Sequence, residues 1–103
     1  MKIDGNWRIE LDMPAGPREG TVRLTTVGKA FSGSWSDGVE TLLFDDGRVE
    51  GENLHWTVLT PIANGEVDVK FDGTVQGNSM TGTVEVGGEG AAGLFRAERL
   101  KSP

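Results

Sequence analysis

DGRVEGENLHWTV at residues 46–58 and DGTVQGNSMTGTV at residues 72–84 are two copies of one pattern, and they align without a gap. Both copies open with Asp-Gly, carry Val at the fourth position and Gly at the sixth, and end in Thr-Val. A valine followed by a Gly-containing polar turn and a new alternating run is typical of a β-hairpin. The second copy starts 26 residues after the first, and four such units would account for almost the whole 103-residue chain. The sequence therefore predicts a meander of hairpins.

Length and composition limit what such a meander can be. A chain of 103 residues makes one domain, residues 1–103, with a single modest core. The absence of cysteine excludes disulfides and thiolate metal sites. A net charge of −6, with ten scattered Lys and Arg residues, argues against nucleic acid or an anionic membrane surface as a partner. We expect no metal and no other cofactor.

We expect no export signal at the start of the chain. Met1-Lys2-Ile3-Asp4 leads directly into the first alternating run, without the apolar stretch of a signal peptide. No apolar run approaches the ~20 residues that a membrane-spanning helix needs. These features predict a cytoplasmic protein, and the short strands argue against a membrane barrel.

Alternation of apolar and polar residues with a period of two predicts eight strands. They cover residues 5–13, 21–27, 31–35, 39–50, 54–58, 67–75, 80–86 and 95–97. Short connections between them favour antiparallel neighbours. All seven aromatic residues fall on inner faces: Trp7, Phe31, Trp35, Phe44, Trp56, Phe71 and Phe95. We therefore predict an all-β fold, an eight-stranded antiparallel up-and-down barrel.

The strand at residues 39–50 does not keep one parity. Leu42 and Phe44 share a face, but Val49 has the opposite parity. A bulge at residues 45–47 would reconcile them, because glycine tolerates the dihedral angles that a bulge requires. The alternative places Leu43 inside and Phe44 outside. We favour the bulge, since it buries the aromatic side chain.

The two ends of the predicted barrel differ. At one end the turns are short, and large apolar residues flank them: Trp7, Phe31, Val49, Leu54, Val75 and Met80. The other end carries the connections at residues 13–20, 37–38, 60–65 and 87–91. Three of these four are long and rich in Gly or Pro, which is typical of loops that cover a site. The predicted shape is a cup with a plugged floor and a looped mouth.

Gly5-Asn6-Trp7 in the first strand and Phe95-x-Ala97-x-Arg99 in the last resemble the calycin pattern of lipocalins, fatty-acid-binding proteins and avidins. The chain also resembles a loose group of small bacterial barrel domains. The resemblance implies that Arg99 packs across Trp7 at the closed end, as a cation–π contact that seals the barrel. The chain lacks the C-terminal helix of lipocalins and the biotin-binding constellation of avidins, so biotin binding is not implied.

A shallow pocket at the looped rim is the candidate site. Its predicted lining is Met13, Trp35, Glu40, Leu42, Val58 and Thr60, and residues 14–20 and 61–65 would form its lip. Spare room is expected where small residues stand: Gly33, Gly82, Gly93 and Ala92. An apolar pocket with few polar groups fits a small hydrophobic or aromatic ligand. The leading hypothesis is therefore a binding module.

Two other functions stay open. Glu40 would face into the barrel beside Trp35, where it could serve an isomerase or cyclase type of enzyme, or simply be a hydrated rim residue. The barrel could also be filled and act as a structural or protein-interaction domain. A binding role is favoured over catalysis, because the single histidine, His55, faces outward without a second base or a nucleophile. Outward Leu43 and Leu59 predict a homodimer.

Overall fold

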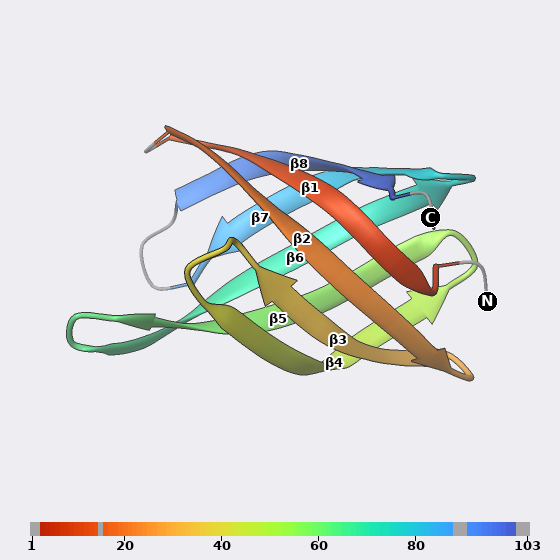
Figure 1. The fold of residues 1–103 in the computed structure, drawn as a ribbon, viewed down its shortest axis with the longest axis horizontal. Helices are drawn as coiled ribbons and strands as arrows, with labels where there is room; N and C mark the ends of the chain where they lie inside the picture. Colours follow the sequence, from red (N-terminus) through yellow and green to blue (C-terminus); the bar gives the residue numbers. More distant parts are fainter. Residues whose placement is uncertain (1–2, 15, 88–90, 101–103) are drawn as a thin grey trace.

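The computed structural model describes residues 3–14, 16–87 and 91–100 of the chain. One antiparallel sheet closes on itself, with each strand beside its neighbours in sequence and β8 paired back to β1 (Figure 1). The strands are β1 (Gly5–Met13), β2 (Gly16–Val27), β3 (Ala30–Ser36), β4 (Thr41–Glu50), β5 (Asn53–Ile62), β6 (Gly65–Gln76), β7 (Ser79–Val86) and β8 (Ala91–Arg99). The predicted eight-stranded up-and-down barrel is confirmed.

The repeated pattern marks two equivalent hairpins. Residues 46–58 cover the end of β4, a tight turn and most of β5, and residues 72–84 cover the same parts of β6 and β7. Gly51 and Gly77 occupy matching positions in the two turns, with φ angles of 61° and 62°. Glycine adopts this left-handed conformation without strain, which explains why both copies carry it.

The predicted bulge in β4 is present. Phe31 pairs with Gly47 and Gly33 pairs with Phe44, so β4 has two residues where β3 has one. The extra residue changes the parity, and Phe44 and Val49 are both buried. Glycine is needed at position 47 for a steric reason, because a Cβ atom there would overlap the ring of Phe31.

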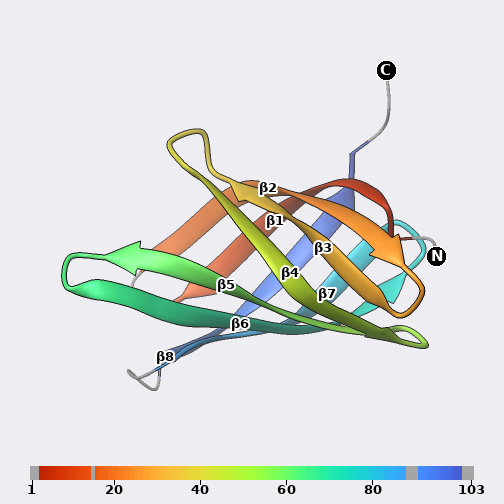
Figure 2. The ribbon, with the colours of Figure 1, turned by 90° about the horizontal axis from the view of Figure 1, so that it is seen from below.

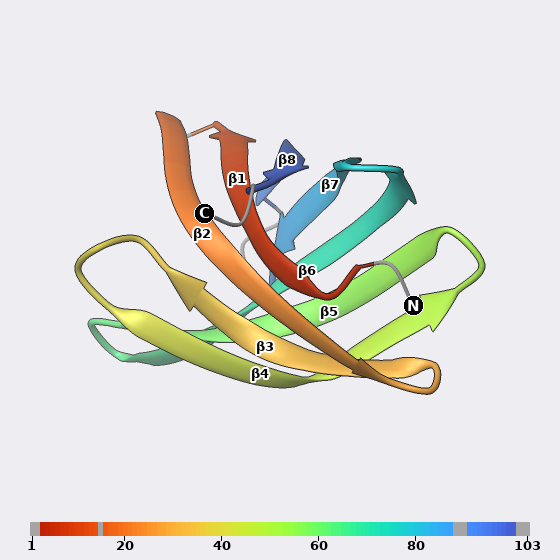
Figure 3. The same ribbon diagram turned by 45° about the vertical axis from the view of Figure 1, so that its right-hand side comes forward.

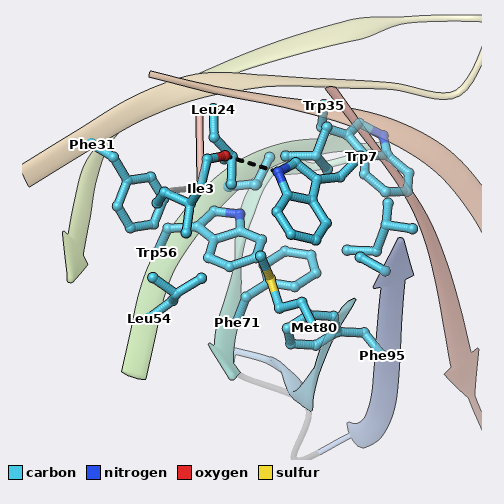
Figure 4. Close-up of a cluster of buried hydrophobic side chains, with 14 of the residues drawn as sticks. Ile3, Trp7, Leu24, Phe31, Trp35, Leu54, Trp56, Phe71, Met80 and Phe95 are labelled. Carbon is cyan, nitrogen blue, oxygen red and sulfur yellow. Dashed lines mark hydrogen bonds between the residues drawn. The ribbon is translucent and has the colours of Figure 1, made fainter. Parts of the chain in front are cut away.

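Trp56 lies at the centre of the barrel interior. All seven aromatic residues are buried, as the strand parity predicts. The Trp56 ring stacks on Phe71 with 4.7 Å between centroids (Figure 4). Phe31, Phe44 and Phe95 surround it at 5.8, 5.9 and 5.7 Å. Each such pair adds about 0.5–1.5 kcal/mol beyond burial. The middle of the barrel is thus filled with side chains.

The closed end contains one more residue than the sequence indicated. The six apolar residues expected there are all buried: Trp7, Phe31, Val49, Leu54, Val75 and Met80. Ile3 joins them with 0% of its surface exposed. Its carbonyl oxygen accepts a hydrogen bond of 2.9 Å from Nε1 of Trp7 (Figure 4). Ile3 therefore belongs to the barrel floor.

Arg99 joins the last strand to the first at this end. It pairs with Trp7 across β8 and β1, and its guanidinium carbon lies 4.4 Å from the centroid of the Trp7 ring, within cation–π range. The guanidinium also donates hydrogen bonds to the Asp4 carbonyl at 2.6 Å and to Oδ1 of Asn78 at 3.0 Å. We call Ile3, Asp4, Trp7 and Arg99 the floor clasp.

The turns of the closed end are also tied to the strands beyond them. In each of the three turns, a backbone carbonyl accepts a hydrogen bond from the strand that follows the hairpin. The pairs are Val49 N–H to Lys29 O at 2.8 Å, Val75 N–H to Glu52 O at 2.9 Å and Arg99 N–H to Asn78 O at 2.9 Å. These bonds hold successive hairpins together at the floor.

Replacing Arg99 should open this end of the barrel. We expect Arg99→Ala to lower the free energy of unfolding by about 1–3 kcal/mol, because the stacking and two hydrogen bonds are lost. Arg96→Ala is the control on the same strand. It removes an exposed ion pair with Glu10 and should cost less than about 1 kcal/mol. Equal losses in urea denaturation would contradict a special role for the clasp.

Spare room at the strand glycines was expected from the sequence, and this expectation is wrong. A Cβ atom at Gly33, Gly82 or Gly93 would overlap the carbonyl oxygen of Arg23, Asp72 or Asp12, respectively. These strands cross too closely for any side chain, which is a common reason for glycine inside a strand. Ala92 is exposed and borders no interior space.

Gly82→Ala tests this close approach. The added methyl group would meet the backbone of β6, and we expect a loss of about 3 kcal/mol in the free energy of unfolding. Gly77→Ala is the matched control, because residue 77 has a left-handed φ but open space around it. It should cost about 1–2 kcal/mol. A smaller loss for Gly82→Ala than for Gly77→Ala would refute the steric explanation.

Two of the predicted lip loops are strands instead. β2 already begins at Gly16, and β5 runs to Ile62 before β6 starts at Gly65. Pro17 and Pro61, which suggested loops, lie where the strand has a partner on one side only. A missing N–H on a free edge breaks no ladder bond. Two long hairpins therefore edge the mouth (Figure 1). Of the predicted connection at 87–91, residues 88–90 lie outside the described residues.

Candidate functional site

β4 and β5 diverge at the mouth. Only residues 48–50 of β4 pair with residues 53–55 of β5. Beyond these pairs, the β3–β4 and β5–β6 hairpins splay apart, as Figure 1 and Figure 2 show, whereas their ends overlap in the view of Figure 3. One side chain bridges the opening, where Oδ1 of Asp46 accepts a hydrogen bond of 3.0 Å from the backbone N–H of Thr57. We call the opening between residues 41–46 and 57–62 the β4–β5 gap.

A pocket lies at the mouth, on the open side of the aromatic core. Its volume is about 90 Å³. All six residues that the sequence suggested border it: Met13, Trp35, Glu40, Leu42, Val58 and Thr60. Phe71 also borders it, so one ring of the stacked pair at the barrel centre reaches the pocket. The structure therefore brings the suggested residues together, and ligand binding by them stays a prediction.

Apolar side chains make most of the pocket wall. Besides the suggested residues, the wall includes Leu11, Val69, Phe71, Val84 and Val86. Trp35 is 8% exposed, and its ring lies over Gly20, where a Cβ atom would come within 2.7 Å of it. The hydroxyl of Thr60 donates to the Val58 carbonyl at 3.3 Å. Trp35 is thus held against β2 by a position that only glycine can occupy.

Glu40 borders the pocket from outside the strand, and not from the inner face of β4 where parity placed it. β4 begins at Thr41 rather than at Val39, and Glu40 is exposed in the connection between β3 and β4. Oδ1 of Asp37 accepts hydrogen bonds from the backbone N–H groups of Val39 at 2.9 Å and Glu40 at 3.0 Å. This Asx-type turn postpones the start of the strand. Glu40 is therefore a residue of the pocket rim.

The rim carries a pair of opposite charges that the sequence did not reveal. Nη2 of Arg18 lies 4.0 Å from Oδ2 of Asp37, and both residues border the pocket. Arg18 pairs with Leu11 across β1 and β2, which puts it on the inner side of the sheet. The signal was present but hidden, because reading Pro17 as part of a loop removes Arg18 from any strand.

Hydrogen bonds stabilise the charged form of Asp37. The backbone N–H of Glu40, followed by that of Val39, lowers the pKa of the Asp37 carboxyl below its usual 3.8, and the charge of Arg18 acts in the same direction. The carboxylate thus fixes the turn that carries Glu40.

Other candidate groups do not gather into a site. Among the described residues, no three His, Cys, Asp or Glu side chains lie close enough to hold a metal ion. His55 is exposed, with Nδ1 3.7 Å from Oδ1 of Asp72. Leu43 and Leu59 are 78% and 52% exposed, but they flank the β4–β5 gap rather than a continuous face. The described part of the chain also contains no helix long and apolar enough to cross a membrane.

No protein-family model matches this chain, and the search of curated proteins found no match either.

Acid should release the rim turn. Since the pKa of Asp37 is lowered in the folded protein, its bonds to Val39 and Glu40 are intact above pH 3.8 and are lost as the pH falls through the folded-state pKa. We expect the amide NMR signals of both residues to shift together, with a midpoint below pH 3.8. Asp37→Asn should abolish this titration. A midpoint at or above 3.8 would contradict the assigned bonds.

Proposed function

We propose that this barrel binds a small, largely apolar molecule in the pocket at its mouth. The observation that supports the proposal is the pocket itself, with an apolar wall and base and charged groups only at its rim. Small-molecule sites combine these features, since apolar contacts supply affinity and a few polar groups set the orientation. The barrel is consistent with a calycin-like fold, in which the cup is suited to holding a ligand.

The size of the pocket limits the ligand. A volume of about 90 Å³ is well below the roughly 300–1,000 Å³ typical of drug-sized ligands. A short alkyl chain or a single ring fits, and anything larger has to extend through the mouth. A ligand with so few atoms binds with modest affinity. We expect the tightest binding to reach a micromolar dissociation constant, which corresponds to a binding free energy of about 8 kcal/mol.

Binding is a better match to this geometry than catalysis. An acid or base that moves a proton must reach a substrate held in a shielded site. Glu40 lies exposed in a turn at the rim, which suits a polar contact with the outer end of a ligand. Arg18 and Asp37 border the same rim and could make similar contacts.

Filling the pocket tests the proposal. Single-ring aromatics such as 4-nitrotoluene, and short brominated alkanols, should quench Trp35 fluorescence saturably in the parent protein. Leu42→Phe adds volume to a pocket-lining residue and should weaken binding by about tenfold or more. Leu43→Phe, on the exposed face of the same strand, should leave it unchanged.

Trp35→Phe tests whether Trp35 is the tryptophan whose fluorescence the ligand quenches, since Trp7 and Trp56 remain in that variant. It should remove most of the saturable signal. Purely linear quenching in the parent protein, or equal effects of Leu42→Phe and Leu43→Phe, would lead us to abandon the pocket as a binding site.

A further inference from the structure

The β4 edge of the gap is an unpaired strand edge. Backbone groups of alternate residues point to opposite edges of a strand. The carbonyl of Glu40 accepts a hydrogen bond from the Asp37 N–H, so it points toward β3. The N–H and C=O groups of Thr41 and Leu43 therefore point toward β5. Within the described residues, no strand pairs with residues 41–47 on that side.

The β5 edge of the gap has fewer free backbone hydrogen-bonding groups than the β4 edge. The N–H of Thr57 points into the gap, where Asp46 accepts it, and by alternation the backbone groups of Leu59 and residue 61 point the same way. Residue 61 is proline, which has no N–H to offer. The Thr57 donor is thus occupied and residue 61 has none, so among the described residues of this edge Leu59 keeps both its N–H and its C=O without a strand partner. The β4 edge is the better template for an added strand.

The pocket opens beside this edge. Leu42 from β4 and Val58 and Thr60 from β5 border both the pocket and the gap. A strand laid antiparallel along residues 41–45 would alternate its side chains between the pocket and the outer surface. The pocket volume of about 90 Å³ is large enough for one such side chain.

The charges around the gap indicate which outward-facing side chains an added strand should carry. Five exposed acidic residues surround it: Glu40, Asp45 and Asp46 on the β4 side, and Glu66 and Asp68 on β6, beyond β5. The basic residues nearby are Lys70, across from Thr57, Arg48, in the last pair of β4 with β5, and Arg23, beside Leu43 and Asp45. Arg18 lies at the pocket rim, where Asp37 faces it. Basic side chains on the partner would therefore meet complementary charge.

We propose that an extended peptide adds as a strand to the β4 edge, with one aliphatic side chain in the pocket and basic side chains outside. This is strand addition, in which backbone hydrogen bonds supply affinity and side-chain pockets supply specificity. The inference depends on the proposed function in one respect, because it assigns the same pocket to the peptide side chain.

A second copy of the chain is a poorer occupant of this edge. Antiparallel pairing of two β4 strands about Leu43 would put Glu40 of each copy opposite Asp46 of the other. Like charges directly opposite each other destabilise a strand pair. Such self-pairing would repeat this repulsion on both sides of the symmetry axis.

The probe is the labelled peptide acetyl-Thr-Lys-Leu-Lys-Thr-amide, followed by fluorescence anisotropy with the full chain. In antiparallel register, its two lysines bond to β4 and face outward, while its leucine enters the pocket and turns its N–H toward β5. N-methylation of both lysines should weaken binding by roughly tenfold or more, since two hydrogen bonds are lost. N-methylation of the leucine should have little effect.

Variants of the protein provide the reciprocal test. Leu43→Pro removes the N–H that points into the gap, and Leu43→Ala removes only the side chain. We expect the proline variant alone to lose the peptide, and a thermal melt establishes that it is folded. If it does not fold, the N-methylated peptides decide the question on the parent protein. Replacing both peptide lysines by glutamate should also abolish binding.

Several results would overturn the inference. The peptide could fail to bind, or N-methylation of the lysines and of the leucine could have equal effects. The protein could also form a concentration-dependent dimer that Leu43→Pro abolishes. Small-molecule quenching of Trp35 without peptide binding would refute strand addition and leave the proposed function intact. Peptide binding that Leu42→Phe leaves unaffected would show that no peptide side chain enters the pocket, and it would leave the proposed small-molecule site untouched.

Discussion

Closure of the sheet between β1 and β8 is the constraint on which the rest of the structure depends. The floor clasp achieves it, since Arg99 packs over Trp7 and bonds to the chain before β1, while Ile3 fills the space beneath. Once the first and last strands are paired, the alternating residues of all eight strands face one enclosed volume. Trp56 and the four phenylalanine rings around it fill its middle, and the pocket lies beyond them at the mouth.

The same features explain why the two ends differ. At the floor, each turn bonds to a strand beyond its own hairpin, and large side chains pack beneath. At the mouth, no such bonds link the β3–β4 hairpin to the β5–β6 hairpin, and the bulge in β4 turns the strand away just past its last pair with β5. There, one hydrogen bond from the Thr57 N–H to the Asp46 side chain replaces the backbone hydrogen bonds between β4 and β5. Pocket and open strand edge thus have a single structural cause.

The sequence predicted the strands, the inward aromatics, the bulge and the plugged floor, because a period of two reports directly which face is buried. It failed where an outcome depends on a distant neighbour. Pro17 and Pro61 suggested loops, but proline is tolerated on edges that have no partner, and partners are not visible in local pattern. Gly82 suggested empty space, whereas a crossing backbone occupies it. Ile3 and Arg18 were missed for the same reason, as was the separation of β4 from β5. The six suggested pocket residues do lie together, because parity and the end of the barrel were enough to place them.

Hydrogen exchange of individual amides tests the central claim, a barrel closed at its floor and open between β4 and β5. The amides of Thr41, Leu43 and Leu59 should exchange much faster than those of Leu42 and Phe44, which point toward β3, and faster than those of the β1–β8 seam. This pattern, alternating along one strand, would establish a free edge. Slow exchange at Leu43 and Leu59, equal to that of their neighbours, would show that the gap is closed and would contradict the account.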